Sequence, residues 1–146
     1  MSAPGAWRSP RPSSTTAVVL AAIAYLAIGR FFPNAGPHVQ MLRLAAWALS
    51  GIVFVAHIAH ERVARGSSNA LMAKRVTLAV AIAALGLAIA GPLYARWVAG
   101  RPIPPVLPAL VLWPLETAVP AYLVARVIGP VVRRRNPQSQ SRTSGM

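Results

Sequence analysis

The sequence has no cysteine and no aspartate, and Glu61 and Glu116 are its only acidic residues. Without cysteine the chain cannot be a small domain held together by disulfides. It also has no Gly-x-Ser-x-Gly motif and no phosphate-binding loop, so we do not expect an enzyme that works through a nucleophilic side chain. Charge is scarce as well: 12% of the 146 residues are charged, whereas soluble domains have about a quarter. These absences argue against a soluble globular domain.

Apolar residues make up 55% of the sequence, which excludes intrinsic disorder of the whole chain. They form four runs that are free of charge except for Glu116 in the last one. A helix rises 1.5 Å per residue, so about 20 residues cross a hydrocarbon core about 30 Å thick. We therefore predict an all-α integral membrane protein, an antiparallel bundle of four transmembrane helices. The expected helices span residues 14–32, 39–60, 75–97 and 106–128.

The two ends of the chain differ from this apolar segment of residues 14–128. Residues 1–13 and 129–146 are rich in Pro, Ser, Gln and Arg, and they offer almost nothing to bury. We expect both ends to be disordered. The sequence Pro33-Asn34-Ala35-Gly36-Pro37 predicts a tight turn between the first two helices.

The basic residues indicate an orientation. Two lie before the first helix, four lie between residue 62 and the start of the third helix at residue 75, and five lie from residue 126 onward, at or after the end of the fourth, whereas four lie at the opposite ends of the helices. The positive-inside rule then places both termini in the cytoplasm, in a bacterial inner membrane. Basic residues beside apolar spans, without interleaved aromatics, favour anionic lipid headgroups over nucleic acid as the partner of the net +13 charge.

The third helix has a pattern of small and large residues. Ala79, Ala83, Gly86 and Ala90 form one small stripe and Ala81, Ala84, Ala88 and Gly91 another, while Leu78, Ile82, Leu85 and Ile89 form a bulky one. Small residues let helix backbones approach each other in a membrane. We expect this helix to pack against two neighbours and to turn its Leu and Ile side chains outward, although a general drift of the composition toward alanine would give a similar pattern.

Glu116 lies in the middle of the fourth expected helix, between Pro114 and Pro120. An ionised carboxylate costs about 2.5–3.5 kcal/mol at that depth on insertion scales, so it should be neutral or partnered. Each proline also deprives the carbonyl four residues earlier of its donor. Glu116 and Thr117 are thus the best candidates for an intramembrane polar site.

Two further residues complete this predicted site. Ser50 and Tyr25 lie near the centres of their own helices, so we expect one of these two hydroxyls to be the hydrogen-bond partner of Glu116. Interrupted helices at mid-depth are where transporters bind cargo and coupling ions. The alternative is a protonated carboxyl that only helps the helices to pack.

His57, His60 and Glu61 form a second candidate cluster on one face of the second helix. The order His-x-x-His-Glu differs from the zinc motif His-Glu-x-x-His, and His38 lies at the opposite membrane face. We therefore predict no metal and no cofactor. The expected structure is an interfacial cluster in which Glu61 pairs with His57, Arg62 or Arg65.

Aligning the second and fourth helices by depth extends this cluster. His57 then lies level with Tyr122, which could donate a hydrogen bond to it. His60 and Glu61 lie level with Arg126, at the headgroup boundary, where an ion pair would be hydrated and contribute little.

The segment from Ala56 to Arg62, followed by a basic loop and an Ala/Gly-rich helix, resembles a group of small four-helix membrane proteins of bacteria. The resemblance implies the four-helix fold and no particular activity. From the sequence we predict a multi-pass inner-membrane protein with a structural or accessory role, bound to a membrane-protein partner or to further copies of itself. A small transporter or proton-coupled subunit centred on Glu116 is the alternative.

Overall fold

The computed structural model describes residues 13–32, 36–98, 100 and 106–134, and their regular structure is entirely helical. The elements are α1 (Ser14–Phe31), α2 (Val39–Ala59) with the π-helical turn η1 (His60–Ala64), α3 (Asn69–Trp97) and α4 (Val106–Arg134). Four helices in these residues are long and apolar enough to cross a membrane. The tails expected to be disordered lie outside the described residues, apart from Ser13 and residues 129–134.

Two helix ends differ from the predicted ones. α3 begins at Asn69 instead of residue 75, because the Ser68 hydroxyl caps it and accepts a hydrogen bond from the Leu71 N–H at 3.3 Å. α4 continues to Arg134 instead of ending at residue 128, so the first residues of the predicted tail are helical. The charges of Lys74 and Arg75 were therefore a poor guide to where α3 begins.

Pro130 lies inside this extension of α4 and needs compensation. A proline has no N–H, so the carbonyl of Arg126 loses the donor it would have in a regular helix. The side-chain amide of Asn69, at the start of α3, donates to that carbonyl at 3.0 Å. The hydrogen bond lets α4 continue past Pro130 and joins it to α3.

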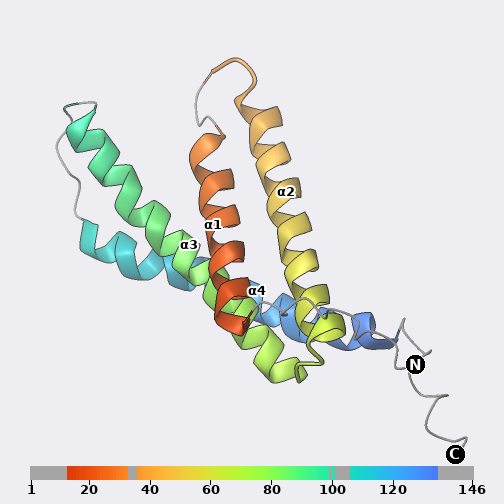
Figure 1. Cartoon of the computed structure of the whole chain (residues 1–146). Coiled ribbons are helices and arrows are strands. Elements are labelled where there is room, and N and C mark those ends of the chain that lie inside the picture. The colour runs from red at the N-terminus through yellow and green to blue at the C-terminus, as the bar shows by residue number, and fades with distance from the viewer. Residues whose placement is uncertain (1–12, 33–35, 99, 101–105, 135–146) are drawn as a thin grey trace, which may run out of the picture.

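Helix α3 is central to the arrangement (Figure 1). Its most extensive contacts are with α4 and then with α1, and its contact with α2 is smaller. In the view of Figure 1, α1, α2 and α3 reverse direction in turn, while α4 runs across them. The expectation that α3 packs against two neighbours is confirmed.

The buried core contains two small clusters that follow each other along α3. One contains Ile58, Met72, Ala73, Val76 and Ala125 and joins α2, α3 and α4. The other contains Val18, Ala21, Ala22 and Ala79 and joins α1 to α3. Alanine provides two of the five residues of the first cluster and three of the four of the second. Where alanines meet, the backbones approach closely and gain dispersion contacts over a short distance.

The bulky stripe of α3 faces outward as predicted. Its members Leu78, Ile82, Leu85 and Ile89 are exposed, whereas Ala79 and Ala83 are buried. Gly86, also in a small stripe, lies against Leu26 of α1, and a Cβ at Gly86 would come within 3.1 Å of that side chain. The periodicity of small and large residues thus identified the packed side of α3.

Gly129 permits a close approach between α4 and α3. A Cβ at this position of α4 would collide with the Asn69 side chain and would lie 2.5 Å from the terminal carbon of Met72. Both residues belong to the first turn of α3. A larger residue at position 129 therefore requires these two side chains to move where the beginning of α3 meets the end of α4.

Candidate functional site

Glu61 is the centre of a buried polar group, which we call the Glu61 cluster: Glu61, Arg65, Ser67 and Arg75. The Glu61 side chain is 0% exposed, and one of its oxygens, Oε2, lies 2.7 Å from the Arg75 guanidinium. The Ser67 hydroxyl donates to Oε2 at 2.7 Å and accepts from Arg75 at 3.1 Å. The other oxygen, Oε1, lies 3.6 Å from Nε of Arg65. Each carboxylate oxygen thus has a cation nearby.

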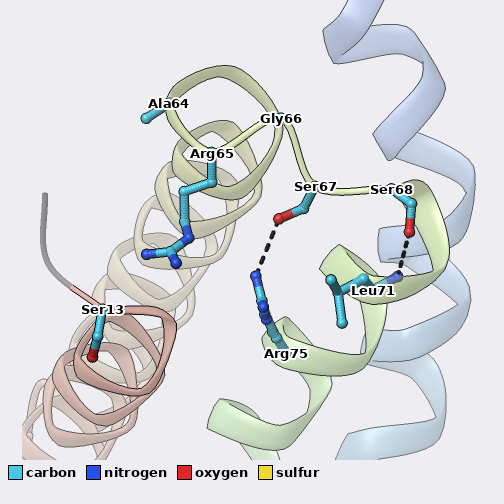
Figure 2. A pocket seen from close by; sticks show the side chains of 8 residues that line it. All are labelled: Ser13, Ala64, Arg65, Gly66, Ser67, Ser68, Leu71 and Arg75. Carbon is cyan, nitrogen blue, oxygen red and sulfur yellow. Dashed lines mark hydrogen bonds between the residues drawn. The ribbon is translucent and has the colours of Figure 1, made fainter.

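The loop between η1 and α3 is shaped so that this cluster can form. Gly66 has φ +64°, which is the left-handed region that glycine occupies without strain. The turn lets the Ser67 N–H donate to the Glu61 carbonyl at 2.9 Å, which ends the helix and brings the Ser67 side chain back to Glu61. Figure 2 shows Ser67 and Arg75 facing each other across this loop.

Arg62 fixes the loop from its other side. Its guanidinium donates to the Ser67 carbonyl at 2.8 Å and to the Gly129 carbonyl of α4 at 3.2 Å. The π-helical turn, closed by the Arg65 N–H on the His60 carbonyl at 3.2 Å, contains one residue more than an α-helical turn. Within this turn Glu61 reaches α3 while the next residue, Arg62, reaches α4.

The structure corrects the expected environment of Glu61. The predicted pairing with Arg65 is present, but Arg62 binds backbone carbonyls instead of the carboxylate. Glu61 is wholly buried, so its ion pairs are not the hydrated ones expected at a headgroup boundary. Arg126 is exposed, and its contact with α3 is through its backbone carbonyl, which accepts a hydrogen bond from the Asn69 side chain.

His57 and His60 lie beside the cluster without joining it. His57 is 5% exposed, and neither of its ring nitrogens has a hydrogen-bond partner among the described residues. Within the same part of the chain, the Nε2 atom of His60 also has none. Tyr122 is half-buried against the cluster around Ile58, so the expected hydrogen bond from Tyr122 to His57 is not formed.

Glu116 is in a different position from the one expected. It is exposed on α4, and neither of the ion pairs found in the described residues involves it. It lines a shallow groove of about 480 Å³ with Leu112, Leu115, Val119 and Pro120, all on the same helix. Thr117 bonds back to the carbonyls of Trp113 and Pro114, at 3.0 and 3.1 Å.

The two hydroxyls expected to pair with Glu116 do not do so. Tyr25 is half-buried next to the cluster of α1 and α3, and its hydroxyl has no hydrogen-bond partner in the part of the chain that the structure describes. Ser50 is half-buried on α2 and makes no side-chain hydrogen bond to another described residue. The fold therefore does not assemble Glu116, Thr117, Ser50 and Tyr25 into one internal site.

Sequence reasoning missed Ser67 and Arg75, the two closest partners of Glu61. The available signal was Ser68 before Asn69-Ala70-Leu71, since serine is a favoured helix N-cap. A helix that begins at Asn69 places Arg75 nearly two turns along α3, where it can face the end of α2.

Within the described ranges, no three His, Asp or Glu side chains converge as metal ligands would. Comparison of the chain with models of known protein families, with curated proteins and with solved structures finds no match.

Proposed function

We propose that the chain is a four-span protein of the bacterial inner membrane and that it acts as an accessory partner of another membrane protein, without catalytic activity. Four helices can cross a membrane, and their outer surface supports this setting. Trp47 and Trp97 are 80% and 83% exposed, and large aliphatic side chains are exposed on all four helices. Exposure of so large an apolar surface to water is unfavourable, whereas its contact with lipid hydrocarbon is not.

In the proposed orientation the spans alternate in direction and both termini are cytoplasmic. The Glu61 cluster, with its surplus of arginine, then lies on the cytoplasmic side. Because the chain has no native cysteine, single cysteines report the topology cleanly. In intact cells an impermeant thiol reagent should label Asn34→Cys and spare Ser68→Cys. The opposite pattern contradicts the orientation.

One observation carries the accessory role: Glu116 is exposed in the middle of a helix that can span a membrane. A carboxylate that faces lipid is costly, and Pro120 also leaves the Glu116 carbonyl without its usual donor. A partner helix that presents an Arg or Lys to this groove satisfies both groups. We therefore assign the α4 groove of Glu116, Leu112, Leu115, Val119 and Pro120 as the docking surface for such a helix.

Site-specific photocrosslinking in native membranes tests this proposal. A photoreactive residue at Leu115, in the groove, should give a discrete protein adduct whose mapped peptide has a basic residue within a membrane span. The same residue at Leu78, exposed on α3, is the matched control and should give none. Glu116→Gln should lower the Leu115 yield about tenfold, because it leaves the partner's cation unpaired. An adduct of two copies of this chain, or equal yields at both positions, contradicts the accessory role.

A transporter or proton-coupled subunit is the second candidate, and the groove between Pro114 and Pro120 is the observation that favours it. In a single copy this groove lies on the outside of the molecule, so a conduction path requires another subunit to cover it. Glu116→Gln discriminates between the two functions once a partner is known. It should abolish proton-coupled transport, whereas an accessory role predicts weaker assembly with normal activity of the assembled fraction.

A further inference from the structure

A cavity of about 550 Å³ lies next to the Glu61 cluster (Figure 2). Its polar lining consists of Ser13, Arg65, Ser67, Ser68 and Arg75, and Leu71 contributes an apolar part. These residues come from the start of α1, the end of η1, the loop, and the first turns of α3. The cavity is therefore built from four segments, and two arginines approach it from different helices.

The cavity has a surplus of positive charge. Arg65 and Arg75 line it, and their side chains are 22% and 23% exposed. Among the described residues Glu61 is the only carboxylate beside the cavity, and it is wholly buried. The other glutamate, Glu116, lies in the α4 groove. Guanidinium groups that are largely removed from water attract anions more strongly than exposed ones, because the local dielectric constant is lower.

The same cavity receives the beginnings of two helices. Ser13 caps α1 and Ser68 caps α3, and both line the cavity. The first N–H groups of a helix have no partners within it, and the helix dipole favours negative charge at that end. In this cavity two helix N-termini and two arginine side chains all favour negative charge. The backbone N–H groups, the serine hydroxyls and the guanidinium groups therefore suit an anionic ligand.

We infer that this cavity binds a phosphate group, held by Arg65 and Arg75 with help from the hydroxyls of Ser13 and Ser68. Arginine matches the geometry of phosphate oxygens and can bind two of them at once. The phosphate is that of an anionic lipid headgroup or of a soluble phosphate compound. The exposed side chain of Leu71 beside the polar lining suits the glycerol and upper acyl chain of a lipid. The lipid source rests on the membrane orientation proposed above.

A charge placed inside the cavity tests the inference without removing a helix cap. Ser68→Asp places a carboxylate in the cavity. Aspartate is also a good N-cap for α3, so the fold should be retained. Gln40→Glu is the matched control, since it adds the same charge to the exposed first turn of α2 at the other end of the molecule. A second pair compares Arg65→Gln, in the cavity, with Arg96→Gln, exposed near the end of α3.

Native mass spectrometry of the full chain in neutral detergent tests the lipid source. It compares how much phosphatidic acid and how much phosphatidylcholine stay bound to the chain. Retention of phosphatidic acid should fall about tenfold in Ser68→Asp and Arg65→Gln and stay unchanged in the two controls. Inorganic phosphate, in thermal unfolding at constant ionic strength, measures the soluble arm. Stabilisation by phosphate that Ser68→Asp abolishes, without lipid selectivity, assigns the site to a soluble ligand.

The inference is overturned if cavity variants and controls retain phosphatidic acid equally and inorganic phosphate stabilises none of them selectively. These measurements use the isolated chain and need no protein partner. They can therefore fail while crosslinking at the α4 groove succeeds, and the reverse is equally possible.

Discussion

The two glutamates of the chain are chemically identical and lie in opposite environments. Glu61 is 0% exposed, beside two arginines and a serine hydroxyl, and Glu116 is exposed in a groove lined by apolar residues. The sequence position suggested the reverse, a hydrated Glu61 and an enclosed Glu116. The comparison shows that the neighbours brought by other helices, and not the depth of a residue in its own helix, decide whether a carboxylate stabilises the fold or is available to a partner.

The largest expected effect is at Glu61. Glu61→Gln leaves Arg75 and Arg65 without their counter-charge and should lower the free energy of unfolding by about 3–5 kcal/mol. Denaturation of the detergent-solubilised chain, followed by tryptophan fluorescence, measures it. The double variant with Arg75→Gln should be less destabilised than the sum of the single changes, because the pair is coupled. Additive losses would show that Glu61 and Arg75 do not interact.

A substitution at Gly129 tests how closely α4 packs against the first turn of α3, next to the Glu61 cluster. Gly129→Ala should destabilise the chain by about 1–3 kcal/mol, because a methyl group must displace Asn69 and Met72. The control is Gly91→Ala, where a Cβ meets nothing within 4 Å, and where alanine's helix propensity should leave stability the same or slightly higher. Equal responses at the two glycines would contradict the close packing of α3 on α4.

His57 sharpens the comparison, since it is buried near Glu61 yet has no hydrogen-bond partner in residues 13–32, 36–98, 100 and 106–134. If it serves only to pack, His57→Leu should raise stability by about 1 kcal/mol, because it removes two unsatisfied polar atoms. The same denaturation experiment gives the answer. A loss of stability would contradict a role in packing alone and would indicate that a polar interaction of the imidazole stabilises the fold.

The smallest effect on the isolated chain is expected at Glu116. Glu116→Gln should leave the unfolding midpoint unchanged, since no described residue pairs with this carboxylate. Its effect should appear only in the crosslinking yield at Leu115, in membranes that contain the partner. A clear shift of the midpoint would mean that Glu116 is part of the fold after all, and the contrast with Glu61 would disappear.

The positions of the four helices could be predicted because each is an apolar run of suitable length, and apolar length is a local property. The outward side of α3 could be predicted too, since Leu78, Ile82 and Leu85 recur at helical spacing among small residues. In α4, Val, Leu and Trp occur on every side, so no periodicity indicated which way Glu116 would face.

The pairing of Glu61 with Arg75 could not be predicted from charge runs, because the two residues lie 14 positions apart on different helices. Placing the start of the third helix at residue 75 also hid the first turns of α3, which begins at Asn69. Glu61 pairs with Arg75 inside the fold, so the charge of Arg75 does not mark the end of a helix here. That information depends on how α2 and α3 cross, which is a tertiary property.

The hydrogen bonds from Arg62 to the Gly129 carbonyl and from Asn69 to the Arg126 carbonyl have a consequence for biosynthesis. Their acceptors are made 67 and 57 residues after their donors. The first three helices therefore emerge from the ribosome with two donors still open at the connection between α2 and α3. Among the described helices α4 carries both acceptors, and a shift of α4 by a single residue would misplace both carbonyls. A helix that is translated later thus sets the register of a connection that was synthesised before it.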